Sequence, residues 1–311
     1  MPKKKAAAKA LRCGFVSIIG RPNVGKSTLL NRIVGEKVAI VSPVPQTTRT
    51  AIQGVLTLPE AQIVFVDTPG IHKADSPINK RMMGAVRNAL EGRDLLLLVV
   101  DAKQRIGEED IQAVDLARKP NVPVVLVLNK IDLIADKRRL LPILDRYRSI
   151  HEFADYVPVS ALKEDGLDIL RRVIVGYLPE GPEYFPEDYV TDQPERFLAA
   201  ELVREKALLL TRAEVPHSIA VIVDRWEAGP KITKIYATIR VERDGQKAIL
   251  IGAGGGTLKN IGSQARLEME QLFGMKIYLD LHVRVQPGWR EKRAFLDAMD
   301  WRTMAGDEDD S

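Results

Sequence analysis

Residues 20–27, GRPNVGKS, have the residue types and spacing of a phosphate-binding loop. They match the pattern GxxxxGKS/T, directly after a predicted strand and before a helix expected to begin near Thr28. Glycines let the backbone fold around phosphates, and the amides and helix N-terminus supply positive potential. Lys26 is expected to reach the β- and γ-phosphates, and the Ser27 hydroxyl to coordinate Mg²⁺. The segment therefore predicts a nucleotide site.

A second motif, Asn-Lys-Ile-Asp at residues 129–132, favours guanine over adenine. The Asp132 carboxylate can accept hydrogen bonds from the ring N–H and the exocyclic amine of guanine, whereas adenine presents a mismatched edge. Asn129 is expected to tie this loop to the phosphate loop, and the stem of Lys130 to cover the base. Ser-Ala at residues 160–161 follows another predicted strand, where a backbone N–H can meet the guanine carbonyl oxygen.

Between these motifs, residues 67–70 have the pattern DxxG. Its aspartate is expected to hold Mg²⁺ through water, and the amide of Gly70 to sense the γ-phosphate. A switch threonine should complete the Mg²⁺ ligands from the segment QTTR at residues 46–49. Thr48 is the first choice for this ligand, and Thr47 is the alternative.

These motifs occur in the order that a GTP site requires, which makes a chance match implausible. The predicted GTP-binding residues are Gly20, Arg21, Pro22, Asn23, Val24, Gly25, Lys26, Ser27, Thr28, Asp67, Thr68, Pro69, Gly70, Asn129, Lys130, Asp132, Ser160 and Ala161. The residues assigned to hydrolysis are Lys26, Thr48, Asp67 and Gly70, and those assigned to the metal are Ser27, Thr48 and Asp67.

A glycine cluster at residues 251–262 best fits the GxxG loop of a KH domain. A dinucleotide fingerprint fails because Thr257 occupies the position of its third glycine, and a plain flexible turn is the other alternative. A loop with few side chains at a helix N-terminus lets a nucleic-acid backbone approach closely. The predicted RNA-binding residues are Gly252, Ala253, Gly254, Gly255, Lys259 and Arg266.

Apolar runs of strand length must position the nucleotide motifs. They lie at residues 14–19, 63–66, 95–100, 122–128 and 156–159, and helix-like stretches separate them. Such continuous runs fit strands buried on both faces of a parallel sheet with crossover helices. We therefore expect an α/β domain with a mostly parallel sheet.

From residue 196 the pattern changes to that of an α+β unit. We expect helices at 197–211, 258–273 and 290–299, strands at 218–226, 232–241 and 276–285, and an apolar run at 248–251. The segment before this unit contains four prolines and is acidic, so it is expected to be a linker. The predicted division is a basic flexible arm (1–12), a GTPase domain (13–178), the linker (179–195), a KH-type domain with a C-terminal helix (196–302) and an acidic tail (303–311).

Composition and charge narrow the function classes. The 311 residues are 45% hydrophobic and 28% charged, which argues against disordered, collagen-like and disulfide-scaffold proteins. The apolar runs are too short to span a bilayer, and the single cysteine suggests a reducing, cytoplasmic environment. Residues 196–293 carry an excess of six positive charges, which indicates an anionic partner; solvated faces that happen to alternate in charge are the other interpretation.

Together the motifs resemble those of translation-factor-related P-loop GTPases, and with the C-terminal unit the chain resembles the Era family of bacterial GTPases. The resemblance covers roughly residues 13–302. It implies a P-loop GTPase domain, a type II KH domain and slow, Mg²⁺-dependent hydrolysis of GTP to GDP. It also implies a monomer that binds single-stranded ribosomal RNA near the 3′ end of the small-subunit RNA and acts in small ribosomal subunit assembly.

Two positions bear on mechanism. Ile71 stands where Ras-type proteins carry a water-orienting glutamine, and its side chain cannot form hydrogen bonds. The resemblance implies that backbone groups and other switch elements position the water. Asn23 corresponds to the residue that gives an oxygen to K⁺ in related potassium-stimulated GTPases, and structural capping of the loop is an equally good account.

Two other functions fit parts of the sequence. The first is an RNA-binding protein whose nucleotide site has become degenerate, and the evidence against it is that the motif residues are intact: Lys26, Ser27, Asp67 and Asp132. In a membrane-associated regulatory GTPase, RNA binding would be secondary, and the basic arm of residues 1–12 would bind peripherally at the inner membrane face. A solvated arm is the simpler interpretation of that charge.

Overall fold

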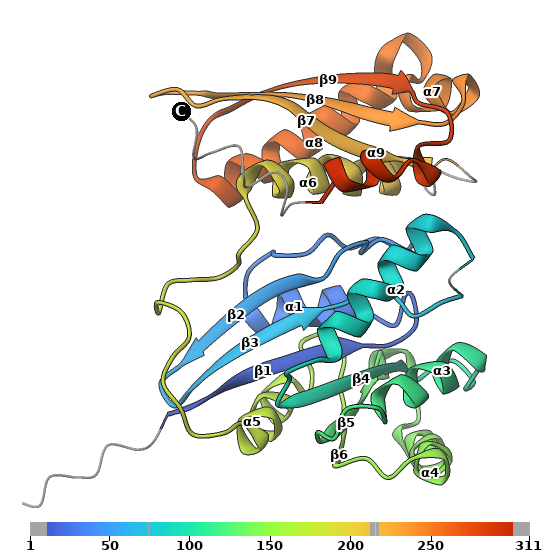
Figure 1. The fold of residues 1–311 in the computed structure, drawn as a ribbon, viewed down its shortest axis with the longest axis vertical. Helices are drawn as coiled ribbons and strands as arrows, with labels where there is room; N and C mark the ends of the chain where they lie inside the picture. The colour runs from blue at the N-terminus through green and yellow to red at the C-terminus, as the bar shows by residue number, and fades with distance from the viewer. Residues whose placement is uncertain (1–10, 74, 212–214, 216–217, 301–311) are drawn as a thin grey trace, which may run out of the picture. The chain divides into compact units, whose positions relative to one another are not determined.

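The structure is a computed structural model that describes residues 11–73, 75–211, 215 and 218–300 (Figure 1). The chain divides into two compact units. The first comprises Met1–Val38, Ala51–His72 and Ala85–Thr191, and the second comprises Ala39–Thr50, Lys73–Gly84 and Asp192–Ser311. Two short segments of the N-terminal half thus group with the C-terminal part. Residues 1–10 of the predicted basic arm, and the predicted acidic tail, lie outside the described residues.

A six-stranded sheet in the order β2-β3-β1-β4-β5-β6 forms the centre of the first unit. Its strands are β1 (Arg12–Ile19), β2 (Ile52–Leu58), β3 (Ala61–Asp67), β4 (Leu95–Asp101), β5 (Val124–Asn129) and β6 (Asp155–Pro158). The β2–β3 pair is antiparallel, and the other pairs are parallel. The predicted α/β fold with a mostly parallel sheet is confirmed.

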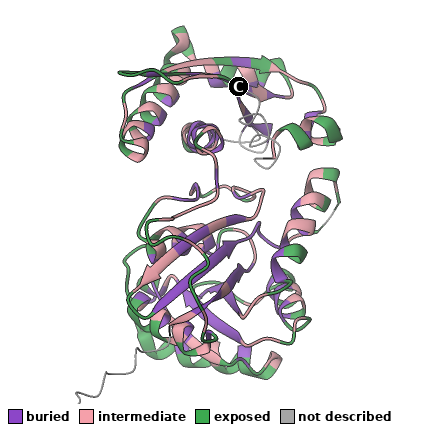
Figure 2. Ribbon diagram, turned by 60° about the vertical axis from the view of Figure 1, so that its left-hand side comes forward, coloured by how far each residue is buried: buried purple, intermediate pink, exposed green. Residues whose placement is uncertain are grey.

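Burial explains the sequence pattern of the central strands. Every residue of β3, β4 and β5 is buried, as expected for a parallel sheet covered on both faces. Figure 2 shows these buried strands among helices with exposed outer sides. The sequence did not indicate β2, because this edge strand is only partly buried and lacks a continuous apolar run.

The helices of the N-terminal half connect the strands. They are α1 (Lys26–Val34), α2 (Pro77–Leu90), α3 (Glu108–Ala117), α4 (Leu140–Ile150) and α5 (Leu167–Tyr177). Because parallel strands end at the same edge of a sheet, the loops after β1, β3, β4, β5 and β6 meet there. Among the described helices, none combines the length and apolar character that crossing a bilayer requires.

The proline-rich segment after α5 runs as irregular chain along the first unit. A buried glutamine of β3, Gln62, holds part of it. The Gln62 Nε2 donates to the Phe185 carbonyl at 2.8 Å, and its Oε1 accepts from the Tyr184 and Phe185 N–H groups. Further along, the Val55 N–H donates to the Val190 carbonyl at 2.8 Å. These hydrogen bonds fix the path of a segment that prolines keep out of regular structure.

The second unit contains a three-stranded sheet packed against α6 and α8. Its elements are α6 (Glu195–Leu210), β7 (Ala220–Glu227), β8 (Thr233–Val241), α7 (Asp244–Ile251), α8 (Gly256–Phe273), β9 (Ile277–Val285) and α9 (Arg293–Ala298). β8 pairs antiparallel with β7 and parallel with β9. The predicted α+β unit is confirmed, although the apolar run at 248–251 proves to be the end of α7.

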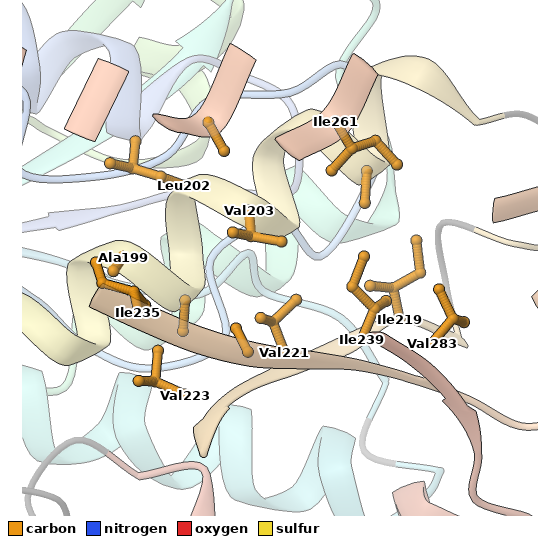
Figure 3. Close-up of a cluster of buried hydrophobic side chains, with 14 of the residues drawn as sticks. Ala199, Leu202, Val203, Ile219, Val221, Val223, Ile235, Ile239, Ile261 and Val283 are labelled. Atoms are coloured by element: carbon orange, nitrogen blue, oxygen red, sulfur yellow. The ribbon is translucent and has the colours of Figure 1, made fainter. Parts of the chain in front are cut away.

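Side chains from the helices and the sheet form the core of this unit (Figure 3). Val203 of α6, Ile235 and Ile239 of β8, and Ile261 of α8 are fully buried. Burying a side chain of this size stabilises the fold by about 1.5–3 kcal/mol. The core therefore fixes α8, and with it the glycine-rich loop that precedes it, against the sheet.

Candidate nucleotide-binding and RNA-binding sites

Lys26 is a buried cation in the first turn of α1. It is 6% exposed, and its Nζ donates to the carbonyls of Gly20 and Arg21 at 3.1 Å each. Burial lowers the pKa of Lys26 to about 8, and the negative charge of Asp67 opposes that shift. Because neutral carbonyls only partly compensate a buried charge, this site favours an anion beside Lys26.

The hydroxyl and carboxylate predicted to bind the metal lie together. The Ser27 Oγ donates to Asp67 Oδ2 at 2.6 Å, and Asp67 is fully buried at the end of β3. Oxygen donors of this kind fit Mg²⁺, which keeps several waters and binds substrate phosphates. The described residues contain no cluster of three or more His, Cys, Asp or Glu that could hold a metal.

The Asn129 side chain joins the loops of the predicted guanine site. Its Nδ2 donates to the Val24 carbonyl at 2.8 Å, and its Oδ1 accepts from the Ala161 N–H at 2.9 Å. A Cβ atom at Gly25 would lie 2.4 Å from Asn129 Nδ2, and Gly25 has φ +98°. The predicted tie between the motifs is therefore present, and it requires glycine at position 25.

Asp132 and Lys130 are both oriented by neighbouring groups. The Ser160 Oγ donates to Asp132 Oδ1 at 2.6 Å. The Lys130 Nζ pairs with Asp101 Oδ2 at 2.8 Å and donates to the Asn23 carbonyl at 2.6 Å. These contacts place the Lys130 ammonium group beside the phosphate loop, and the covering of the base by its stem stays a prediction.

Sequence reasoning missed two buried acidic residues that support the site. Asp101, which is 6% exposed, ends β4 and holds Lys130. Asp110, which is 3% exposed, lies in α3 and accepts from Arg21 Nε at 2.9 Å. An acidic residue directly after a buried strand was the available signal for Asp101, because strand ends share one edge of the sheet. Asp110 gave no comparable signal.

The DxxG segment packs tightly on the phosphate loop. A Cβ atom at Gly70 would lie 2.7 Å from Pro22 Cγ. The Ile71 N–H donates to the Gly20 carbonyl at 3.1 Å, and the Thr68 Oγ1 donates to the Ile18 carbonyl at 2.9 Å. Ile71 itself is 1% exposed, so its apolar side chain is part of the packing.

The two threonines predicted as switch ligands belong to the second unit. Thr47 and Thr48 lie in the segment Ala39–Thr50, and Thr48 is 7% exposed. The Thr47 Oγ1 donates to the Val44 carbonyl at 2.6 Å. The assignment of Thr48 to the metal stays a prediction.

The predicted RNA-binding loop lies between α7 and α8 in the second unit. Gly252, Gly254 and Gly255 have φ of +71°, +57° and +78°, and glycine adopts such positive φ angles without strain. Ala253 and Gly254 are exposed. The loop thus presents backbone directly before α8, whose 18 residues give its N-terminus a helix dipole.

The two predicted cations of this site differ in environment. Lys259 is exposed in the first turn of α8. The Arg266 Nη1 forms an ion pair with Glu270 Oε1 at 3.0 Å, one turn further along the helix. Lys259 is therefore the more available cation for a phosphate.

Comparisons with known proteins identify both parts of the chain. Residues 15–130 match the family described as 50S ribosome-binding GTPase, and residues 214–290 match the KH domain. The GTPase Era of Syntrophus aciditrophicus (strain SB) is 50% identical over 92% of this chain and 94% of its own length. The GTPase Era of Geotalea uraniireducens (strain Rf4) is 48% identical over 93% of this chain and 97% of its own length.

Two solved structures are similar over nearly the whole chain. One is Era in complex with MgGDPNP and nucleotides 1506–1542 of 16S ribosomal RNA. The other is a variant of Aquifex aeolicus Era bound to GDP and AlF4⁻. Each has a TM-score of 0.91 and 43% identity, and the match covers 94% of this chain and 99% of the solved chain.

We expect the affinity for a nucleoside triphosphate to fall as the pH rises above about 8, the pKa to which burial lowers Lys26. Phosphate oxygens beside Lys26 stabilise its charge and raise its pKa in the complex, so the bound state holds more protons than the free state. The affinity should therefore fall by up to about tenfold per pH unit. Calorimetry in buffers of different ionisation enthalpy should show proton uptake on binding that increases between about pH 7.5 and 8.5. Uptake that stays constant over this range would contradict the role of Lys26.

Proposed function

The chain belongs to the Era family of GTPases, and from this membership we propose a GTP-hydrolysing switch that binds ribosomal RNA through its KH domain. Its RNA is the 3′ end region of small-subunit ribosomal RNA, and it acts in assembly of the small subunit. The RNA assignment draws support from the solved relative bound to nucleotides 1506–1542 of 16S ribosomal RNA. The single observation that best supports the nucleotide assignment is the Asn129 side chain, which joins the phosphate loop to the Ala161 loop.

GTP is proposed to bind to the residues predicted from the motifs. The Asp132 carboxylate recognises guanine, and Ser160 orients that carboxylate through a hydrogen bond of 2.6 Å. The Lys130 stem covers the base. The Lys26 ammonium and the loop amides bind the phosphates, and the buried position of Lys26 strengthens that attraction.

Mg²⁺ is proposed to be held by Ser27 and Asp67, with Thr48 as the switch ligand. Support comes from the oxygen donors of Ser27 and Asp67, 2.6 Å apart, and from MgGDPNP in the solved relative. Bound Mg²⁺ neutralises charge on the phosphate oxygens. The Gly70 amide senses the γ-phosphate. Because the Ile71 side chain cannot orient water, backbone groups must do so, and intrinsic turnover is slow.

RNA is proposed to bind along the loop of Gly252, Ala253, Gly254 and Gly255, with Lys259 and Arg266 nearby. The amides of a left-handed glycine backbone at a helix N-terminus attract phosphates, and such loops clamp about four nucleotides. The ion pair of Arg266 with Glu270 reduces the contribution that Arg266 can make.

Several finer assignments are part of the same proposal. The domains are a GTPase domain at 13–178, a linker at 179–195 and a KH-type domain at 196–302, and the protein is a cytoplasmic monomer. A K⁺ ion beside Asn23 would be tested by comparing hydrolysis rates in K⁺ and Na⁺. The membrane-associated alternative depends on the basic arm, most of which lies outside the described residues.

We expect Asp132→Asn to shift the preference from GTP to xanthosine triphosphate, because an amide donates where the carboxylate accepted from guanine. The loss of GTP affinity should be on the order of 100-fold, as for other charge-assisted pairs. Competition binding with the two nucleotides measures the change. Asp145→Asn, at an exposed position of α4, is the control, and GTP affinity equal to that of the control would refute the guanine assignment.

We expect the double substitution Ala253→Asp and Gly254→Asp to weaken RNA binding by about tenfold or more, because the two carboxylates repel phosphates. Fluorescence anisotropy with a single-stranded oligonucleotide matching the 3′ end of 16S ribosomal RNA measures this. The control replaces the same two residues by asparagine. Aspartate and asparagine both tolerate the left-handed backbone of Gly254, where φ is +57°. The KH assignment is wrong if the variant with two aspartates and the variant with two asparagines bind RNA with equal affinity. Nucleotide affinity should not change.

A further inference from the structure

Helix α6 of the second unit holds the segment Ala39–Thr50 at two points. The Arg204 Nη2 donates to the Thr47 carbonyl. The Glu205 Oε1 accepts from the Val41 N–H at 2.7 Å. Arg204 is 2% exposed and Glu205 is 3% exposed, so water competes little with either hydrogen bond.

The hydrogen bond from Arg204 acts directly on the backbone of the switch threonine. The Thr47 carbonyl and the Thr48 N–H belong to one planar peptide group. A guanidinium bound to that carbonyl therefore restrains the backbone from which the Thr48 side chain projects, and such charge-assisted hydrogen bonds are stronger than neutral ones. Arg204 can thus influence Thr48 without contacting nucleotide.

Arg49 fastens the same segment near its C-terminal end. Its Nη1 donates to the Ile219 carbonyl at 2.8 Å, and its guanidinium lies 5.4 Å from the ring centroid of Trp289. Trp289 is fully buried and donates through Nε1 to the Ser218 carbonyl at 3.0 Å. Burial, with the positive charge of Arg204 nearby, lowers the pKa of Arg49 to about 9.

Stability alone does not explain the arginine in α6. Arg204 forms an ion pair with Glu201 in the same helix, yet its buried Nη1 has no hydrogen-bond partner in the described structure. A buried polar group without a partner is destabilising, and a buried ion pair is a weak source of stability. A cavity lined by Arg49, Glu201 and Arg204 lies beside these contacts, so the packing leaves room for rearrangement.

The segment Lys73–Gly84, which follows DxxG, is likewise a part of the second unit. Arg81 forms ion pairs with Asp297 at 2.6 Å and Asp300 at 2.8 Å. The Gln46 Nε2 donates to Asn79 Oδ1 at 3.4 Å and so joins the two segments. The segment with the proposed switch threonine and the segment after DxxG therefore belong to the same unit as the proposed RNA-binding loop.

We propose that Arg204 and Arg49 are positioning residues that couple GTP hydrolysis to RNA occupancy of the second unit. The inference rests on the proposed function. RNA at the start of α8 reaches α6 through a shared core, in which Val203 of α6 and Ile261 of α8 are fully buried. From α6 the hydrogen bond of Arg204 reaches the backbone beside Thr48. Binding free energies coupled in this way are reciprocal, so GTP must alter RNA affinity by the same factor that RNA alters GTP affinity.

The test compares kcat and KM for GTP hydrolysis by the full chain with and without a saturating RNA oligonucleotide matching the 3′ end of 16S ribosomal RNA. In the wild type, RNA changes kcat. In Arg204→Gln and in Arg49→Met, the ratio of kcat with RNA to kcat without it falls to about one. GDP affinity measured without RNA, and RNA affinity measured without nucleotide, stay within about twofold of wild type, because the coupling acts only when both ligands are bound.

Arg196→Gln, which removes the same charge from the same helix, is the control and keeps the wild-type ratio. Arg49→Met keeps an unbranched apolar stem and removes a buried charge, so it decides the test if Arg204→Gln does not fold. The inference is overturned if the folded variants keep the wild-type ratio of kcat values. It is also overturned if the wild type hydrolyses GTP and binds RNA but RNA does not change its kcat. Absence of GTP hydrolysis or RNA binding in the wild type overturns the proposed function itself.

Discussion

The nucleotide site depends on one side chain that joins its loops, that of Asn129. Its amide reaches the phosphate loop through the Val24 carbonyl and the Ala161 loop through a backbone N–H. This geometry needs Gly25, because a Cβ atom there would lie 2.4 Å from Asn129 Nδ2. Removing the amide would leave buried backbone groups without partners, at a cost of about 1–3 kcal/mol each. Three loops far apart in sequence therefore have one fixed relative position.

Basic and acidic side chains from different elements lie close together around this centre. Lys26 lies near Asp67, Lys130 pairs with Asp101, and Arg21 pairs with Asp110. Such pairs contribute little net stability, since desolvation offsets much of their attraction. They orient the groups before nucleotide binds, so that little reorganisation accompanies binding and hydrolysis. Burial lowers the pKa of Lys26, and an anion beside its charged form would raise that pKa again.

The second unit is more than an attached RNA-binding domain. It includes the segments Ala39–Thr50 and Lys73–Gly84, held by Arg204, Glu205 and the Arg81 ion pairs. A GTPase must rearrange such segments during its cycle. When a second ligand-binding unit holds the same segments, the free energy of rearrangement depends on both ligands. The coupling that we propose therefore requires no contact between the two ligands.

The sequence by itself determined the fold class, the GTPase motifs and the KH-type unit, because each leaves a local pattern. Buried strands such as Leu95–Asp101 are continuous apolar runs, and glycine loops must accommodate left-handed backbone, as at Gly254. The edge strand β2 left no such pattern, since only part of it is buried. Only the tertiary structure decided which distant residues complete these motifs. Asp101 and Asp110 beside the phosphate loop, and Arg204 on the Thr47 carbonyl, are charged residues whose partners lie at least 29 positions away. The periodicity of apolar residues along a helix or strand indicates which face is buried. It does not indicate which polar group from a distant part of the chain will contact that face.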